Sequence, residues 1–140
     1  MAEKKQDKYD LSGIWQGLGN AIVPVLKDNW LRVIVGYFVE DEAETSHLQI
    51  FVLNADADDY EDLTLASWDH TDYDDAILNA QDICGQLRTS LRETSPWTSL
   101  TFVLERNGTY RVEFGYEPIK DYSSMFLLDW QSRYLTPQEL

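Results

Sequence analysis

Residues that could act as nucleophiles or bases are few, and their spacing does not assemble a familiar catalytic group. Cys84 is the single cysteine, and the two histidines, His47 and His70, are distant from it in the sequence. A cysteine nucleophile needs an adjacent base to activate it. Cys84 instead falls among the apolar residues of a predicted helix, which is typical of a small core residue. Asp69 and Asp72 could orient the imidazole of His70, but no nucleophile accompanies them.

Metal and cofactor motifs are equally incomplete. The acidic run that begins at Asp56 has the composition of a calcium loop, but Glu61 stands where the loop needs glycine and Ser67 where it needs the closing glutamate. The sequence also lacks a phosphate-binding glycine loop, a serine-nucleophile elbow and a zinc-protease motif. We therefore predict a protein that is not an enzyme, with no catalytic residues, no cofactor and no metal. An enzyme with an acid–base site of unfamiliar pattern is the alternative with least support.

The distribution of charge is the most informative feature of the composition. The 140 residues include 25 acids and 11 bases, which gives a formal net charge of −14. No lysine or arginine lies between Arg32 and Arg88, and that stretch contains 14 of the acids. Such a surface repels the phosphates of nucleic acids and of anionic membranes. We therefore expect neither nucleic acid nor a membrane as partner, and predict a positively charged protein instead.

The densest part of the acidic stretch is the predicted partner-binding site. Crowded like charges oppose one another, and a basic partner would relieve that repulsion and associate rapidly. Trp68 lies between two acidic runs, where a large ring can anchor an interface. The predicted contact residues are Asp56, Asp58, Asp59, Glu61, Asp62, Trp68, Asp69, Asp72, Asp74 and Asp75.

Hydrophobic periodicity predicts the elements that position these residues. Asp10 or Ser12 would cap a first helix that Pro24 ends, and Asp72 or Asp74 would cap a second helix over residues 69–94. A third helix is expected over residues 121–135. Strands are expected at residues 31–39, 47–54, 63–68, 98–105 and 109–116, the last two joined by a type I′ turn at Asn107-Gly108.

The order α-β-β-(β)-α-β-β-α indicates an α+β fold, in which an antiparallel sheet of four to five strands carries helices on a face. Residues 1–9 are polar and are expected to form a flexible tail, and residues 10–140 a single domain. No apolar run reaches the ~18 residues that a membrane span needs. A polar start and a lone cysteine favour the cytoplasm.

The run Pro96-Trp97-Thr98-Ser99 and the closing Trp130 and Tyr134-Leu135, together with motifs in the N-terminal half, resemble the YezG-type antitoxin and immunity protein family. The similarity extends from about Ile14 to Leu135, but residues 55–75 are enriched in aspartate, and Phe126-Leu-Leu-Asp129 stands where the family often carries basic residues. The motifs that carry it are Ile22-Val23-Pro24, Trp30, Tyr37-Phe38-Val39, Pro96-Trp97-Thr98-Ser99-Leu100-Thr101-Phe102, Asn107-Gly108, Phe114, Tyr116, Trp130 and Tyr134-Leu135.

The resemblance implies an immunity protein that binds and neutralises a cognate toxin domain, commonly a nuclease, by covering its surface. Nucleases tend to be basic because they bind phosphate, which agrees with the charge of this chain. The alternative is a small acidic secretion chaperone, which would form a homodimer and hold an extended effector segment. The sequence leaves the oligomeric state of the immunity protein open.

Overall fold

The structure is a computed structural model, which describes residues 12–40, 45–66, 71–91, 93–94, 96–120 and 122–135. The elements follow the predicted α+β order. They are α2 (Ser12–Ile22), η1 (Val23–Val25), β1 (Trp30–Val39), β2 (Ser46–Asn54), β3 (Glu61–Asp62), α3 (Leu63–Ala66), α4 (Thr71–Ser90), β4 (Ser99–Glu105), β5 (Tyr110–Gly115) and α5 (Ser124–Tyr134). The expected tail at residues 1–9 lies outside the described residues. Among the described helices, none combines the length and the apolarity needed to cross a membrane.

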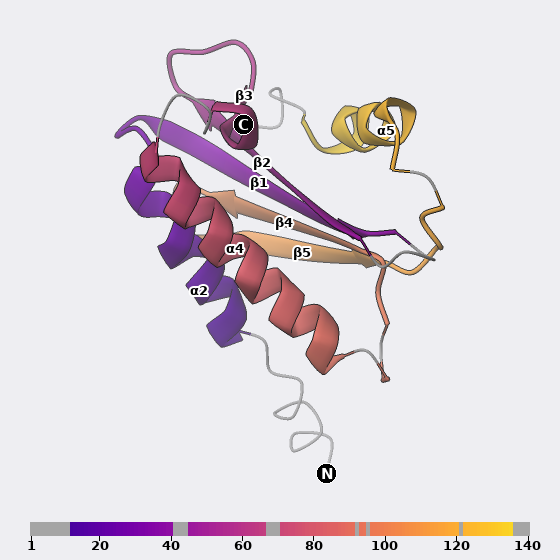
Figure 1. The fold of residues 1–140 in the computed structure, drawn as a ribbon. Coiled ribbons are helices and arrows are strands. Elements are labelled where there is room, and N and C mark those ends of the chain that lie inside the picture. The colour runs from indigo at the N-terminus through magenta and orange to yellow at the C-terminus, as the bar shows by residue number, and fades with distance from the viewer. Residues whose placement is uncertain are drawn as a thin grey trace.

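The strands form one antiparallel sheet in the order β3-β2-β1-β4-β5. β1 is its centre, and Val35 pairs with Ile50 of β2 on one side and with Phe102 of β4 on the other. Every β1 residue after Leu31 is buried, because helices cover both faces of the sheet (Figure 1). The apolar run of β1 reflects this two-sided burial.

Two separate cores lie on the two faces of the sheet. α2 and α4 cover one face, where they pack on Val33, Val35 and Tyr37 of β1. α5 lies on the opposite face, where Trp130 packs with Ile34 and Phe38. The expectation of helices on a single face therefore misplaces the last helix. Successive residues of a strand point to opposite faces, so β1 supplies both cores.

The predicted third strand is wrong in position. β3 comprises only Glu61 and Asp62, and the next four residues, Leu63–Ala66, form the short helix α3. The backbone N–H of Thr64 donates to Asp62 Oδ1 at 3.0 Å, and the Thr64 hydroxyl donates to the same oxygen. Asp62 therefore accepts a hydrogen bond from a backbone N–H at the start of α3 that has no partner within the helix. The strand ends after two residues because the helix begins there.

The caps predicted for the second helix are also wrong. α4 begins at Thr71, so Asp72 and Asp74 lie within its first turns rather than before it. The helical spacing of apolar residues from Ile77 to Leu91 predicts a buried stripe, and it is confirmed at Ala80, Cys84 and Leu87. Acidic residues at these positions still interact favourably with the positive end of the helix dipole.

The hairpin between β4 and β5 uses a longer loop than predicted. The Gly108 N–H donates to the Glu105 carbonyl at 2.9 Å, and the Glu105 N–H donates to the Thr109 carbonyl at 2.8 Å. These two bonds enclose three residues, 106–108, and not the two of a type I′ turn. Gly108 has a φ of +94°, which is the left-handed residue such a three-residue loop requires.

Candidate functional site

The structure brings two acidic segments to the same end of the sheet. The loop between β2 and β3 and the first turns of α4 both lie toward the upper left of Figure 1, and α3, which follows the loop and β3, contacts β2, β3 and α4. We call the acidic residues there with described side chains, apart from Asp62, the acidic end. They are Asp56, Asp58, Asp59, Glu61, Asp74 and Asp75.

All six carboxylates of the acidic end are available to a partner. Glu61 is half-buried and the other five are exposed. None of the six forms an ion pair with another described residue. Their repulsion is therefore not offset within the described part of the chain, which is the arrangement that favours a cationic partner.

Four of the predicted contact residues stand apart from this group. Asp62 points its carboxylate at Thr64, so its role in the described structure is to begin α3. Asp72 belongs to α4, but its side chain is outside the described residues. Trp68 and Asp69 lie outside the described residues altogether.

A buried arginine anchors the base of the acidic loop. Arg32 is 5% exposed and donates from Nε to Glu105 Oε2 at 3.0 Å and from Nη1 to the Tyr60 hydroxyl at 3.3 Å. Burial alone would lower the pKa of Arg32, but the bonds to Glu105 and Tyr60 raise it above the ordinary value. Arg32 therefore stays charged and holds Tyr60, at the end of the loop, against the sheet.

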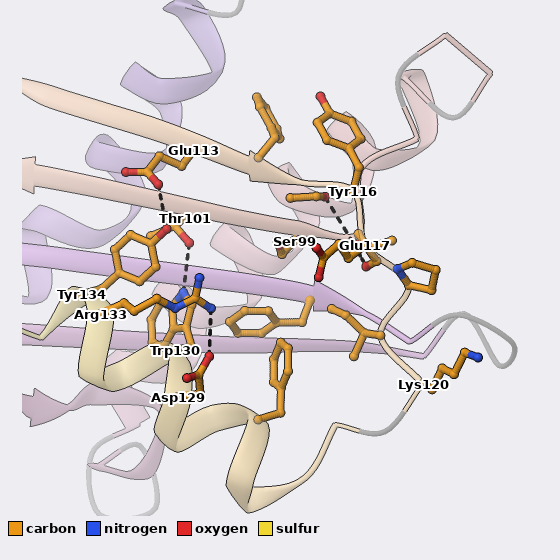
Figure 2. A pocket seen from close by; sticks show the side chains of 17 residues that line it. Ser99, Thr101, Glu113, Tyr116, Glu117, Lys120, Asp129, Trp130, Arg133 and Tyr134 are labelled. Atoms are coloured by element: carbon orange, nitrogen blue, oxygen red, sulfur yellow. Dashed lines mark hydrogen bonds and ion pairs between the residues drawn. The ribbon is translucent and has the colours of Figure 1, made fainter.

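A second concave surface, not predicted from the sequence, lies between α5 and β5 (Figure 2). The cleft has a volume of about 580 Å³. The Tyr134 hydroxyl donates to Glu113 Oε1 at 2.8 Å across it, and Arg133 pairs with Asp129 at 3.3 Å. Burial raises the pKa of Tyr134, and the bond to Glu113 raises it further. The bond from Tyr134 to Glu113 attaches α5 to the sheet, whereas the pair of Arg133 and Asp129 lies within α5. The i, i+4 spacing of Trp130 and Tyr134, which places both rings on one face of the helix, is the sequence signal that could have indicated this attachment.

The groups that suggested chemistry serve the fold in the described residues. His47 Nε2 lies 2.7 Å from Glu40 Oε1, and its ring stacks on Tyr122 at 3.8 Å between centroids. His70 lies outside the described residues. Within the described ranges, no three His, Cys, Asp or Glu residues are grouped so as to hold a metal ion.

Cys84 is expected to resist thiol reagents in the folded protein. It is fully buried, and burial raises the pKa of its thiol from 9.0 to about 12. The reactive thiolate is therefore scarce at pH 8, and labelling with a disulfide reagent should be at least tenfold slower than in urea. Because the folded pKa is raised, the contribution of Cys84 to stability should be lost as the pH rises above about 9, where the unfolded thiol ionises. Rapid labelling in native buffer would contradict this assignment.

The chain matches the model of a known protein family. A family model described as "Immunity protein YezG-like" matches residues 11–135. This range includes every described element, from α2 to α5, and it covers both cores. No curated protein sequence matches the chain.

Proposed function

The chain belongs to the YezG-like immunity protein family, and from this we propose that it binds a cognate basic toxin domain of the nuclease class and blocks it by covering its surface. The family supports the immunity role and a toxin as the partner. The observation that supports a basic partner is the acidic end, where a loop, the start of β3 and a helix contribute six carboxylates without ion pairs among the described residues.

Electrostatics explains how such a surface would act. Nuclease domains carry basic surfaces because they neutralise phosphates, and an acidic protein competes for those same groups. Opposite charges also steer the encounter, raising association rates from about 10⁵–10⁶ to about 10⁸–10⁹ M⁻¹s⁻¹ at low salt. An immunity protein benefits from such speed because it must capture the toxin before damage occurs. The proposed action is stoichiometric occlusion in the cytoplasm, without turnover.

Co-expression with the toxin is the direct test. We would tag the chain and co-express it with the C-terminal domain encoded by the neighbouring gene, then measure complex formation and cell growth. The proposal expects a stoichiometric complex that restores growth. A toxin domain that is bound but still cleaves nucleic acid, or one that is not bound at all, would contradict it.

Neutralising the acidic end should slow association with the toxin domain. In the variant, Asp56, Asp58 and Asp59 become Asn and Glu61 becomes Gln, while Asp62 is kept because it begins α3. Removing four steering charges should lower the on-rate by about tenfold at low salt and flatten its salt dependence. Stopped-flow fluorescence or surface plasmon resonance across a salt series would measure both.

A matched control separates the site from the overall charge. Asp82, Glu93, Glu117 and Asp129 are exposed and lie outside the acidic end. Converting these four to Asn or Gln changes the net charge by the same amount. The on-rate of this control should stay close to that of the natural chain. Equal losses in the two variants would show that the charge acts globally and that the acidic end is not the binding surface.

A further inference from the structure

β5 forms one outer edge of the sheet. It pairs with β4 on its inner side, and no described strand lies beyond it. The bond from the Glu105 N–H to the Thr109 carbonyl fixes the alternation of the antiparallel pair. Residues 111, 113 and 115 therefore direct their backbone groups toward β4. Tyr110, Val112 and Phe114 direct their N–H and C=O groups away from it, toward the free edge.

The side chains of β5 divide between the two faces in the same alternation. Arg111 pairs with Val103 and Glu113 with Thr101, and both of these β4 residues lie on the face that α5 covers. Arg111 and Glu113 are both exposed. Val112 and Phe114 pack on the opposite face, against the core under α2. The edge thus carries one cation and one anion, two residues apart on the same face.

We propose that two copies of the chain pair their β5 strands antiparallel, about a twofold axis that passes through Val112. In this register Arg111 of each copy lies directly opposite Glu113 of the other. Val112 meets Val112, and Tyr110 meets Phe114 on the opposite face. The outward backbone groups of these three residues face one another, so the two sheets join into one continuous sheet.

The neighbouring registers are excluded by charge and by backbone geometry. An axis through Arg111 would place two arginines directly opposite each other, and an axis through Glu113 would place two glutamates opposite each other. Like charges in directly opposed positions destabilise a strand pair, whereas opposite charges stabilise it. A register shifted by one residue would place the outward backbone groups of one β5 strand opposite residues of the other strand whose backbone groups point inward. Among these registers, the one through Val112 satisfies both requirements.

The proposed interface is remote from the acidic end. β3 and the acidic loop lie at the other edge of the sheet, beyond β4, β1 and β2, or about 19 Å across at about 4.8 Å per strand. Both acidic ends therefore remain open in the dimer. At physiological salt the Debye length is about 8 Å, so repulsion between the two acidic chains is largely screened. This inference goes beyond the proposed function and does not depend on it.

The dimer also differs from the secretion chaperone that the charge and size of the sequence had suggested as an alternative. An edge strand that is paired with a second copy has no free backbone groups with which to hold an extended segment of another protein. Dimerisation through β5 and peptide capture by β5 are therefore mutually exclusive.

A charge swap tests the register directly, with sedimentation velocity and light scattering over a concentration series of the full chain. Arg111→Glu alone and Glu113→Arg alone each place like charges opposite each other at both symmetry-related positions. Each should raise the dimer dissociation constant about tenfold or more. The double variant restores opposite charges and should dimerise as the natural chain does. Tyr134→Phe is the control, because it removes the bond from α5 to Glu113 without touching the edge.

A second variant tests the edge without changing charge. Val112→Pro removes an N–H that points outward and leaves the bonds to β4 intact, a position at which an edge strand tolerates proline. It should be a folded monomer by circular dichroism and sedimentation. The proposal is overturned if the natural chain is monomeric over the whole concentration series or if Val112→Pro still dimerises. It is also overturned if the double variant does not recover the dimerisation that the single variants lose.

Discussion

Replacing Trp130 with alanine is expected to lower the free energy of unfolding by about 3–5 kcal/mol. The indole is 2% exposed, and its Nε1 donates to Thr101 Oγ1 at 3.0 Å. Its ring meets Phe38 edge-on at 5.4 Å between centroids. The substitution leaves a cavity under α5, and it also removes the N–H that donates to the buried Thr101 hydroxyl. Both changes lower the free energy of unfolding. Urea denaturation followed by circular dichroism would measure the change.

Leu128→Ala on the same helix is the matched control. Leu128 is 58% exposed, so its removal should change stability by less than about 0.5 kcal/mol. The loss of stability for Trp130→Phe should lie between those of Trp130→Ala and Leu128→Ala, because phenylalanine keeps most of the packing but not the hydrogen bond to Thr101. A loss below about 1 kcal/mol for Trp130→Ala would mean that α5 is not attached to the sheet through this ring.

Gly36→Ala is expected to lower the free energy of unfolding by about 1–3 kcal/mol, although it adds only a single methyl group. Gly36 lies in the central strand directly beneath α5. A Cβ atom there would stand 2.7 Å from Trp130 Cζ2 and 2.8 Å from Phe38 Cζ. Both neighbours are aromatic rings packed in the same core, so neither can yield as a flexible side chain would. Thermal and urea unfolding would measure the destabilisation.

Gly13→Ala is the control for this effect. A Cβ at Gly13 meets nothing within 4 Å, and the residue lies in α2. Alanine there should stabilise the helix by up to about 1 kcal/mol. A double-mutant cycle adds a second check, since the cost of Gly36→Ala should shrink when Trp130 is already alanine. If Gly36→Ala lowers stability equally with Trp130 and with alanine at position 130, the close contact between residue 36 and Trp130 is contradicted.

The three tryptophans of the α2 and α4 face illustrate how well local chemistry predicts burial. Large rings bury much apolar area, and Trp15, Trp30 and Trp97 are all buried. The spacing of apolar residues likewise predicts the buried stripe of α4 and the alternation of β4. Trp68, the ring expected at the surface, lies outside the described residues, so its role as an interface anchor stays a prediction.

The candidate site shows what local residue chemistry does not predict. The charge pattern located the acidic loop, but it could not distinguish an aspartate that begins a helix from one that faces solvent. Asp62 and Asp59 are three residues apart in the same acidic run, yet Asp62 bonds to Thr64 whereas Asp59 is exposed. The difference depends on where β3 ends, and side-chain capping of so short a helix leaves almost no periodic signal.

The sequence by itself determined the fold class, the helical stripes, the concentration of negative charge and the family, because each depends on residue types at short, regular spacing. Only the tertiary structure decided that α5 covers the face opposite α2 and α4, and that the loop after β2 and the start of α4 lie at the same end of the sheet. It alone also showed that β5 is an edge on which Arg111 and Glu113 are exposed. These features depend on strand order and on the hand of each connection, which arise from contacts between residues far apart in the chain.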